Sequence, residues 1–397
     1  MSHHSLKKQI LPGSRLGVFG GGQLGRMFVH AAQRLGYHVA VFDPERNCPA
    51  AQAADEHYCP ATSSKSTEDL IADFASSCAA VTLEFENVPA EWVRIAEKTT
   101  PVRPGADFLA ICQDRVREKS SVAAAGLPVT PFMPVTNEDD VRAAGEKFGW
   151  PLIVKTVRSG YDGKGQVVIR SETDIAAQWV RLDTNDAIAE QRIDFAAEVS
   201  MLGARNATGS IVTYPLIENS HANHILDISR CPVSPELVQY EARAREVVSG
   251  IAEAFAVEGL FCVEFFIDRN IGLMVNEIAP RPHNSGHLTI EAFEVSQFEQ
   301  QVRAMCNLPL LGTDFRRPAA MANLLGDLWY RSAGSTMPLS QPRGDLQVAD
   351  VLAHRDAHLH FYGKAEARPG RKMGHLTCLS DTAESAVDAA QRLREML

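Results

Sequence analysis

The chain has 397 residues, of which 45% are hydrophobic, so it is long enough to bury more than one core. Its formal net charge of −10 argues against a broad basic surface for DNA, RNA or an anionic membrane. The 8 cysteines include no C-x-x-C pair, which indicates reduced, mostly buried side chains. No run approaches the roughly 18 apolar residues of a membrane span, and residues 1–15 form no apolar signal segment, so we expect a cytoplasmic protein.

The first part of the chain alternates short apolar runs with amphipathic helical segments. The pattern predicts strands over 16–19, 37–42 and 79–85, with a helix over 23–36 between the first two. Such alternation is typical of a parallel α/β sheet. A glycine and a proline then end regular structure in the turn at 124–128, where we expect a domain junction.

In the rest of the chain the predicted helices and strands follow a different order, which is typical of α+β modules. A helix over 139–148, a strand over 151–157, a glycine-rich loop and a strand over 166–170 indicate a compact module. Longer strands are then expected over 196–202, 209–216, 260–268 and 272–278, with a final hairpin around 359–379.

The run GGGQLG at residues 20–25 fits G-x-G-x-x-G between a predicted strand and a predicted helix, and Asp43 ends the next strand. Glycines at such a place let a phosphate approach the backbone at a helix N-terminus. The pattern alone leaves three interpretations open: a nicotinamide dinucleotide, the phosphate or sugar phosphate of another ligand, and a plain tight turn.

A second glycine-rich run follows Lys155, a basic residue on a predicted strand. The run SGYDGKGQ at residues 159–166 forms a loop between two strands and contains Lys164. Backbone N–H groups and lysines of such a loop can face the oxygens of a triphosphate. The alternative is a surface hairpin with solvated lysines.

Two glutamates, Glu264 and Glu277, lie on predicted neighbouring strands. A hairpin centred on the Asn270–Ile271 bond would pair Asp268 with Leu273 and therefore Glu264 with Glu277. Like charges directly opposite each other are destabilising, so a positive group should lie between them. Two carboxylates together with phosphate oxygens are typical ligands of Mg²⁺. The alternative is a pair of exposed edge glutamates that bind lysines.

Two polar stretches follow the second glutamate. Residues 276–287 combine prolines, histidines, an arginine and an asparagine at the exit of a strand, although the histidines could be ordinary loop residues. Four cations then fall within nine residues: Lys364, Arg368, Arg371 and Lys372. In an acidic chain such a cluster is suited to a monoester phosphate, unless it is merely a solvated charge run.

Lys155 with its glycine loop and the glutamate pair resemble the ATP-grasp superfamily. Longer strings at 20–27, 160–166, 276–287 and 368–375 resemble the N5-carboxyaminoimidazole ribonucleotide synthetase family and occur in the order of that family. The resemblance implies an α/β and α+β chain with the ATP-grasp fold. Its parts would be an N-terminal pre-ATP-grasp (Rossmann-like) domain at 1–118, a small lid domain at 119–192 and a C-terminal ATP-grasp domain at 193–397.

By matching position, the resemblance implies which residues meet ATP and magnesium. Glu264 and Glu277 would bind magnesium, residues 190–193 would pair with adenine through backbone groups, and Glu198 would hold the ribose hydroxyls. The spacing from residues 214–216 favours His221 over His224. The full ATP set is Arg115, Lys155, Gly160, Tyr161, Asp162, Gly163, Lys164, Gly165, Gln166, Glu190, Gln191, Arg192, Ile193, Glu198, His221, Asn276 and Glu277.

The resemblance also implies a site for aminoimidazole ribonucleotide across the domain interface. Its contacts would be Gln23, Leu24, Glu84, Tyr161, Asp162, Arg281, His283, Asn284 and Ser285, with Lys364, Arg371 and Lys372 at the phosphate. The catalytic set would be Asp162, Lys155, Arg281 and His283, with Asp162 as the base for the amine. One stretch departs from the family: after Arg115 the family often has Leu-Thr-Gln-Lys, and residues 116–119 read Val-Arg-Glu-Lys.

The activity that the resemblance implies is ATP-dependent carboxylation of 5-aminoimidazole ribonucleotide by bicarbonate, through carboxyphosphate, in purine biosynthesis. It implies ATP and Mg²⁺, with two ions during turnover, neither NAD nor biotin, and a homodimer. The runner-up is a formate-dependent glycinamide ribonucleotide transformylase of the same fold. A dehydrogenase would rest on the first glycine run alone, and a non-catalytic nucleotide sensor would be expected to have lost a metal ligand.

Overall fold

The computed structural model describes residues 8–158, 165–330 and 346–397. Its N-terminal sheet is parallel, as the alternation of apolar runs and helices predicts, with the strand order β3-β2-β1-β4. The strands are β1 (Arg15–Phe19), β2 (His38–Phe42), β3 (Glu56–Tyr58) and β4 (Ala80–Leu83). Helices of this part are α1 (Gln23–Arg34), α2 (Thr67–Ser76), α3 (Ala90–Glu97) and α4 (Ala106–Cys112). Most positions of β1, β2 and β4 are buried because helices cover both faces of a parallel sheet.

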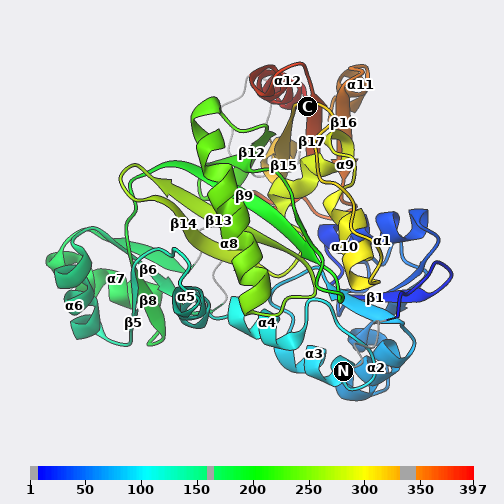
Figure 1. Cartoon of the computed structure of the whole chain (residues 1–397), viewed down its shortest axis with the longest axis horizontal. Coiled ribbons are helices and arrows are strands. Elements are labelled where there is room, and N and C mark those ends of the chain that lie inside the picture. Colours follow the sequence, from blue (N-terminus) through cyan, green and yellow to red (C-terminus); the bar gives the residue numbers. More distant parts are fainter. Residues whose placement is uncertain (1–7, 159–164, 331–345) are drawn as a thin grey trace, which may run out of the picture.

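A small antiparallel sheet forms a separate lobe, seen on the left of Figure 1, which we call the lid. Its strand order is β5-β8-β6-β7. The elements are β5 (Phe132–Val135), β6 (Leu152–Thr156), β7 (Gln166–Ile169), β8 (Ala187–Gln191), α6 (Glu138–Phe148) and α7 (Ile175–Leu182). Alternate residues of β6, Leu152 and Val154, enter the apolar core of the lid, so Lys155 lies on the opposite face of the sheet.

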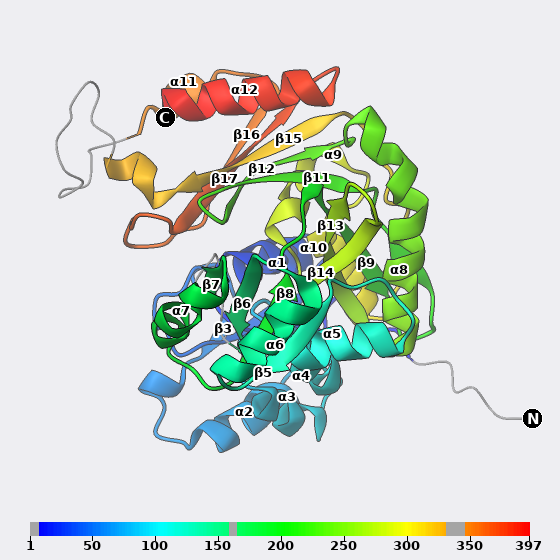
Figure 2. The same cartoon turned by 90° about the vertical axis from the view of Figure 1, so that its left-hand side faces the viewer.

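A large antiparallel sheet makes up the rest of the chain, in the order β14-β13-β9-β11-β12-β15-β17-β16, and β10 pairs with β9. Its strands are β9 (Phe195–Arg205), β10 (Ile211–Thr213), β11 (Ile217–Ala222), β12 (Ile225–Cys231), β13 (Gly259–Asp268), β14 (Gly272–Ala279), β15 (Ala319–Leu325), β16 (Ala357–Phe361) and β17 (Lys372–Leu379). The remaining helices are α5 (Arg115–Ala124), α8 (Glu241–Ala254), α9 (Thr289–Ala292), α10 (Gln297–Met305), α11 (Val348–Leu352) and α12 (Ala383–Met396). Figure 1 shows α8 lying across β9 and β13, and Figure 2 shows α12 along the C-terminal part of the sheet.

The predicted strand over 209–216 is wrong in its extent. The structure has the short β10 there and begins a separate strand, β11, at Ile217. The N–H group of Tyr214 still donates to the carbonyl of Leu202 (2.9 Å). Pro215 has no N–H group to continue the ladder, so the chain leaves β9 at this point. The predicted final hairpin is confirmed, because β16 and β17 pair antiparallel.

The N-terminal sheet and helix α10 share one apolar core. Helix α10 packs against α1, as both views show, and its Phe298 and Met305 join Leu16 and Phe28 in that core. The buried Arg103 adds polar contacts between the two parts, because its Nε donates to Oε2 of Glu258 (2.9 Å) and its Nη1 to the carbonyl of Met305 (2.5 Å). Within the described ranges no helix is long and apolar enough to cross a membrane.

Candidate active site

The hairpin of β13 and β14 places Glu264 directly opposite Glu277, as the sequence predicts. The predicted route to that pairing is nevertheless wrong. Asp268 pairs with Gly272, whereas its predicted partner, Leu273, pairs with Ile267. With a regular ladder from this tighter turn, the two glutamates would be one position out of register.

A β-bulge brings the two glutamates back into register. Oδ1 of Asp268 accepts the N–H groups of Asn270 and Ile271 (2.8 Å each), which explains the tight turn. The register then shifts at Asn276, the extra residue of β14, so that Glu277 regains its partner. Bulges place two residues of one strand opposite one residue of the other and re-aim side chains in this way.

Each of the two carboxylates has a cationic or imidazole partner. Nη1 of Arg115 donates to Oε2 of Glu277 (2.9 Å), and Nε2 of His283 lies 3.0 Å from Oε1 of Glu264. Burial would raise the pKa of the Glu264 carboxyl, but His283 above all, and then His221, lower that pKa to about 2. Arg115 is thus a positive group at the like-charged pair, although it lies beside Glu277 and not between the two carboxylates as expected.

The oxygens at this pair fit magnesium. Besides the two carboxylates, Oδ1 of Asn276 is buried without a hydrogen-bond partner among the described residues. In the described ranges no group of three or more His, Cys, Asp or Glu side chains is arranged to hold a metal. Glu264 and Glu277 would thus supply only part of a coordination shell. This suits Mg²⁺, which keeps water and takes phosphate oxygens as its other ligands.

A buried chain of hydrogen bonds fixes the ring of His283. Its Nδ1 lies 2.8 Å from Oγ of Ser285, and that hydroxyl lies 2.8 Å from Oγ of Ser200 on β9. Nδ2 of Asn219 donates to Ser200 (2.9 Å), and Oγ of Ser229 donates to Oδ1 of Asn219 (2.8 Å). The relay spans β9, β11 and β12, so the large sheet itself orients His283 toward Glu264.

The lid and helix α5 contribute a buried cluster of charges. Nζ of Lys155 donates to Oε2 of Glu190 (2.8 Å), while Nζ of Lys119 lies 3.6 Å from Oε1 of Glu190 and donates to the carbonyl of Asn276 (2.9 Å). Burial would raise the pKa of the Glu190 carboxyl, but Lys119 and Lys155 lower it to about 2. The cluster links the lid to β14 beside Glu277.

The sequence interpretation missed both Lys119 and the side chain of Glu190. Lys119 is only 1% exposed, and it lies one helical turn after Arg115. Residues four apart on a helix share a face, so this spacing was a usable signal. Glu190 was assigned an adenine contact through its backbone, and no local pattern indicates its pairing with Lys155, which is 35 residues away.

Glu198 of β9 and His221 of β11 lie together, as their common assignment to ATP requires. The carboxylate of Glu198 pairs with Nδ1 of His221. Burial would lower the pKa of the His221 ring, but its hydrogen bond with Glu198 raises it. His224 is exposed in the turn after β11 and has a positive φ of 66°. The geometry thus favours His221, as the spacing does.

Carboxylates of the chain itself bind three N–H groups of the first glycine run. The N–H of Gly21 donates to Oδ2 of Asp43 (2.7 Å), and the N–H groups of Gly22 and Gly25 donate to the carboxylate of Glu84 (2.8 and 3.1 Å). A Cβ on Gly22 would lie 2.9 Å from Oε1 of Glu84, so glycine is needed for this approach. The glycines therefore allow the close approach of Glu84 and Asp43 to the start of α1.

Residues assigned to the ribonucleotide lie around this carboxylate. Arg281 pairs with Glu86, a partner that the sequence interpretation missed, and its positive charge also acts on the buried Glu84. Gln23 and Leu24 open α1, directly after the glycines. Asn284 and Ser285 are buried in a short 3-10 helix over Asn284–Leu288.

The cation cluster lies in the loop between β16 and β17. Nζ of Lys364 donates to the carbonyl of Lys372 (2.6 Å), and Nη1 of Arg371 donates to the carbonyl of Glu366 (2.9 Å). Arg368 forms an exposed ion pair with Glu366. Burial, followed by the charge of Arg371, lowers the pKa of the Lys364 ammonium to about 8.

An open cavity of about 590 Å³ lies beside Lys364. Its lining comprises Trp329, Tyr330, Phe361, Gly363, Lys364, Ala365, Glu366, Ala367, Arg368 and Met373. Nε2 of Gln52 donates to the carbonyl of Gly363 (2.9 Å), which ties this loop to the N-terminal sheet. Lys364 also interacts electrostatically with Glu84, so the cation cluster faces the same interface as the glycine run.

The tip of the second glycine loop lies outside the described residues. The predictions for Gly160, Tyr161, Asp162, Gly163 and Lys164 therefore have no structural counterpart. Gly165 and Gln166 are described where β7 begins. Gln166 pairs with Lys155 across β6 and β7.

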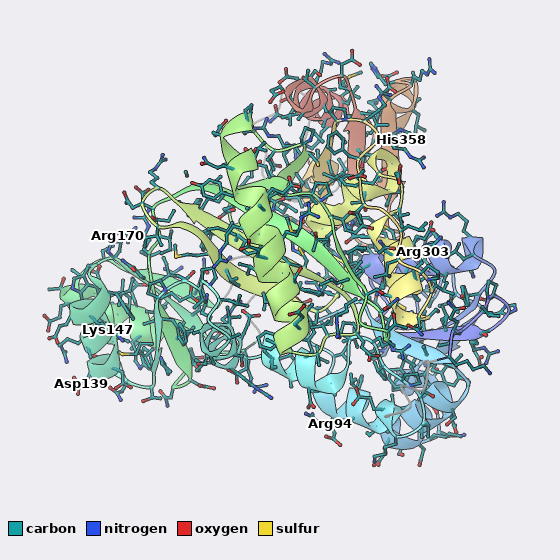
Figure 3. The ribbon with its side chains drawn as sticks, in the orientation of Figure 1. Arg94, Asp139, Lys147, Arg170, Arg303 and His358 are labelled. Carbon is teal, nitrogen blue, oxygen red and sulfur yellow. The ribbon has the colours of Figure 1, made fainter. Side chains whose placement is uncertain are left out.

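A second cavity, of about 360 Å³, lies on the lid. It is lined by Pro151, Val168, Arg170 and Arg192. Arg192 belongs to the 190–193 segment assigned to adenine, together with Gln191 at the end of β8 and Ile193 beyond it. Figure 3 shows Arg170 on the lid, with Asp139 and Lys147 of α6 at its outer edge.

Three protein families match successive parts of the chain. The ribonucleotide synthetase preATP-grasp domain matches residues 14–113, the ATP-grasp domain matches 120–298, and the phosphoribosylaminoimidazole carboxylase C-terminal domain matches 319–389. These matches agree with the ATP-grasp fold that the resemblance implies. They also favour the carboxylase interpretation over the transformylase, because the C-terminal match is to a carboxylase domain.

Relatives match over nearly the whole length. N5-carboxyaminoimidazole ribonucleotide synthase of Staphylococcus aureus (strain COL) is 38% identical over 371 residues, which are 93% of each chain. The crystal structure of N5-carboxyaminoimidazole synthetase from Staphylococcus aureus complexed with ADP has a TM-score of 0.87 and 36% identity and covers 98% of both chains. The structure of N5-carboxyaminoimidazole synthase from Aspergillus clavatus with ADP and 5-aminoimidazole ribonucleotide has a TM-score of 0.84 and 28% identity and covers 96% of this chain and 98% of that chain. The chain therefore belongs to the N5-carboxyaminoimidazole ribonucleotide synthase family.

Proposed function

We propose that the chain uses ATP to carboxylate 5-aminoimidazole ribonucleotide with bicarbonate, which gives N5-carboxyaminoimidazole ribonucleotide, ADP and phosphate. One observation carries the proposal: the opposed pair Glu264 and Glu277 lies beside the lysine cluster of the lid and is linked through His283 to the segment assigned to the ribonucleotide. The relatives solved with ADP, and with ADP and 5-aminoimidazole ribonucleotide, support these two ligands.

The chemistry begins with a poor electrophile, bicarbonate. An oxygen of bicarbonate attacks the γ-phosphorus of ATP, the bond to the bridging oxygen breaks, and ADP leaves. The carboxyphosphate formed is then attacked at its carboxyl carbon by the substrate amine, which releases phosphate and a proton. Magnesium, when bound at Glu264 and Glu277, supplies charge neutralisation for the phosphate oxygens.

Lys155 and Arg115 supply positive charge next to the transferred phosphoryl group. Glu190 fixes the ammonium of Lys155 through the 2.8 Å contact, so little reorganisation is needed when the phosphate arrives. Arg281 and His283 face the carboxyl group of the intermediate, and His283 is held in one orientation by its serine relay. Water must be excluded during the lifetime of carboxyphosphate, and closure of the lid over the site would exclude it.

We further propose that the ATP, ribonucleotide and magnesium residues act as the resemblance assigns them, with two magnesium ions during turnover. Asp162, outside the described residues, remains the proposed base for the amine. The phosphate of the ribonucleotide would meet Lys364, Arg371 and Lys372. The carbonyl contacts of Lys364 and Arg371 already restrict these side chains, which reduces the entropy lost when an anion binds.

The decisive experiment measures ADP release with defined combinations of substrates. ADP should appear with bicarbonate and aminoimidazole ribonucleotide together, and formate with glycinamide ribonucleotide should give only the background seen without substrate. With ¹⁸O-labelled bicarbonate, one label must enter the released phosphate. Turnover with formate would overturn the assignment, and unlabelled phosphate during coupled turnover would exclude carboxyphosphate.

A further inference from the structure

The backbone groups at the bulge in β14 need hydrogen-bond partners from outside the ladder of strands. A bulge disrupts the ladder locally, and buried backbone groups that lose partners are costly. Two ionisable side chains of α5 meet the backbone here. Nζ of Lys119 donates to the carbonyl of Asn276 (2.9 Å), and Oε2 of Glu118 accepts the N–H of Ile278 (3.0 Å).

These contacts come from one face of α5. Residues three and four positions apart on a helix are neighbours, so Arg115, Glu118 and Lys119 project together. They contact residues 276–278 in turn, with Arg115 on the side chain of Glu277 between the two backbone contacts. Glu118 is 2% and Lys119 is 1% exposed, so water cannot replace either side chain.

The start of α5 is itself fixed in place. Asp114 caps the helix, because its Oδ1 accepts the N–H of Arg117 (2.9 Å). The N–H of Arg115 donates to the carbonyl of Val157 at the end of β6 (3.1 Å). The first turn of α5 is therefore a rigid base from which two side chains reach the bulge.

We propose that Glu118 and Lys119 are positioning residues that hold the bulge of β14, so that Glu277 stays opposite Glu264. This inference rests on the proposed magnesium role of that pair. A slip of one residue turns every side chain of a strand to the other face, so loss of the bulge would separate the two carboxylates. Glu118 acts through an acceptor oxygen of the right reach, and this step does not require its negative charge.

Two variants separate reach from the ionisable carboxyl group. Glu118→Asp keeps the carboxyl group but is one methylene shorter, so it cannot reach the N–H of Ile278. Glu118→Gln keeps the reach and an acceptor oxygen but has no carboxyl group. Glu97→Asp is the matched control, because Oε1 of Glu97 accepts the N–H of Ala106 (2.9 Å) in the N-terminal part of the chain, away from the glutamate pair.

The readout is the binding of Mn²⁺ in the presence of ADP, followed by electron paramagnetic resonance, together with the affinity for ADP without metal. In Glu118→Asp we expect Mn²⁺ to bind about tenfold more weakly or worse, as expected for a buried N–H group without a partner. Metal-free ADP should bind within about twofold of the parent chain, because the adenine and ribose contacts remain. Glu118→Gln and the Glu97 control should bind both ligands nearly normally.

Two alternative results would each overturn the proposal. If Glu118→Gln is folded but loses Mn²⁺ while Glu118→Asp keeps it, the carboxyl group and not its reach is what matters. If both variants bind Mn²⁺ normally, the bulge does not need Glu118. Circular dichroism shows whether Glu118→Asp folds. If it does not fold, normal Mn²⁺ binding by Glu118→Gln supports the acceptor role of Glu118, and loss of Mn²⁺ binding by Glu118→Gln refutes that role. The binding assay contains neither ribonucleotide nor bicarbonate. Its results therefore test the role of Glu118 even if the proposed substrate of the enzyme is wrong.

Discussion

Glu264 and Glu277 lie opposite each other on neighbouring strands, yet each carboxylate interacts with a partner from a different part of the chain. His283, which follows β14, contacts Glu264, and Arg115 of α5 contacts Glu277. These contacts hold the two carboxylates side by side, and the pKa of the Glu264 carboxyl is lowered to about 2. Two carboxylates kept together are suited to a divalent cation, which motivates the first prediction.

Glu277→Gln should leave the fold intact and lower turnover by about a hundredfold or more, because a neutral amide binds Mg²⁺ weakly. Steady-state ADP release measured across magnesium concentrations checks this. Glu218→Gln is the matched control, since Glu218 forms a comparable ion pair with Arg230 on the same sheet (2.9 Å). Near-normal turnover of Glu277→Gln at limiting magnesium would mean that the glutamate pair is structural.

Lys364→Ala and Arg371→Ala should weaken ribonucleotide binding by roughly 10–150-fold, which corresponds to a charge-assisted contact of about 1.5–3 kcal/mol. The affinity for ATP should barely change. Arg368→Ala is the control, because Arg368 is exposed and paired with Glu366, and it should have little effect. Titration calorimetry with each ligand checks this, and equal losses for ATP and ribonucleotide would place the cations at the wrong ligand.

The pKa of Lys364, lowered to about 8, predicts a pH dependence. A lysine with a lowered pKa loses its charge as the pH rises through that value, while the substrate phosphate remains a dianion. The apparent affinity for the ribonucleotide should therefore fall by about tenfold between pH 7 and pH 9. Lys364→Arg should flatten this profile, because arginine stays charged. An unchanged slope in Lys364→Arg would assign the titration to another group.

A stack of buried histidines predicts sensitivity to acid. The ring of His375 lies 4.6 Å from that of His287 and 4.4 Å from that of His360, and burial holds the pKa of both His287 and His375 well below the usual value. Below about pH 6.5 these histidines bind protons in the unfolded chain but not in the folded chain. The free energy of unfolding therefore falls as the pH falls. The slope should approach about 1.4 kcal/mol per pH unit for each such histidine.

Urea unfolding at pH 7, 6 and 5.5 measures this slope. His375→Phe should reduce this slope by the contribution of about one histidine. The variant also loses the contact between Nδ1 of His375 and the hydroxyl of Tyr362 (2.9 Å). His354→Gln, at an exposed position, should leave the slope as it is. A slope that does not change in His375→Phe would show that this ring is protonated in the folded chain.

The sequence predicted contacts well where they follow from local periodicity and poorly where they depend on distant chain segments. The hairpin of β13 and β14 was predictable from its turn, but the pairing of the two glutamates also depends on the bulge at Asn276, which has no local signature. The carboxylate partner of the glycine run could not be predicted, because Glu84 lies 62 residues beyond Gly22. Lys119 is an intermediate case. Its helical spacing from Arg115 can be read from the sequence, but its contact with β14 cannot.

The core shared by α1 and α10 limits how this chain could be recombined with its relatives. Phe298 and Met305 complete an apolar surface that also belongs to Leu16 and Phe28, although the two groups lie near opposite ends of the sequence. A chimaera joined just before α5 would bring an α1 from one parent against an α10 from another. Such exchanges should yield stable proteins only when α10 is transferred together with the N-terminal segment, because its side chains were selected against that surface.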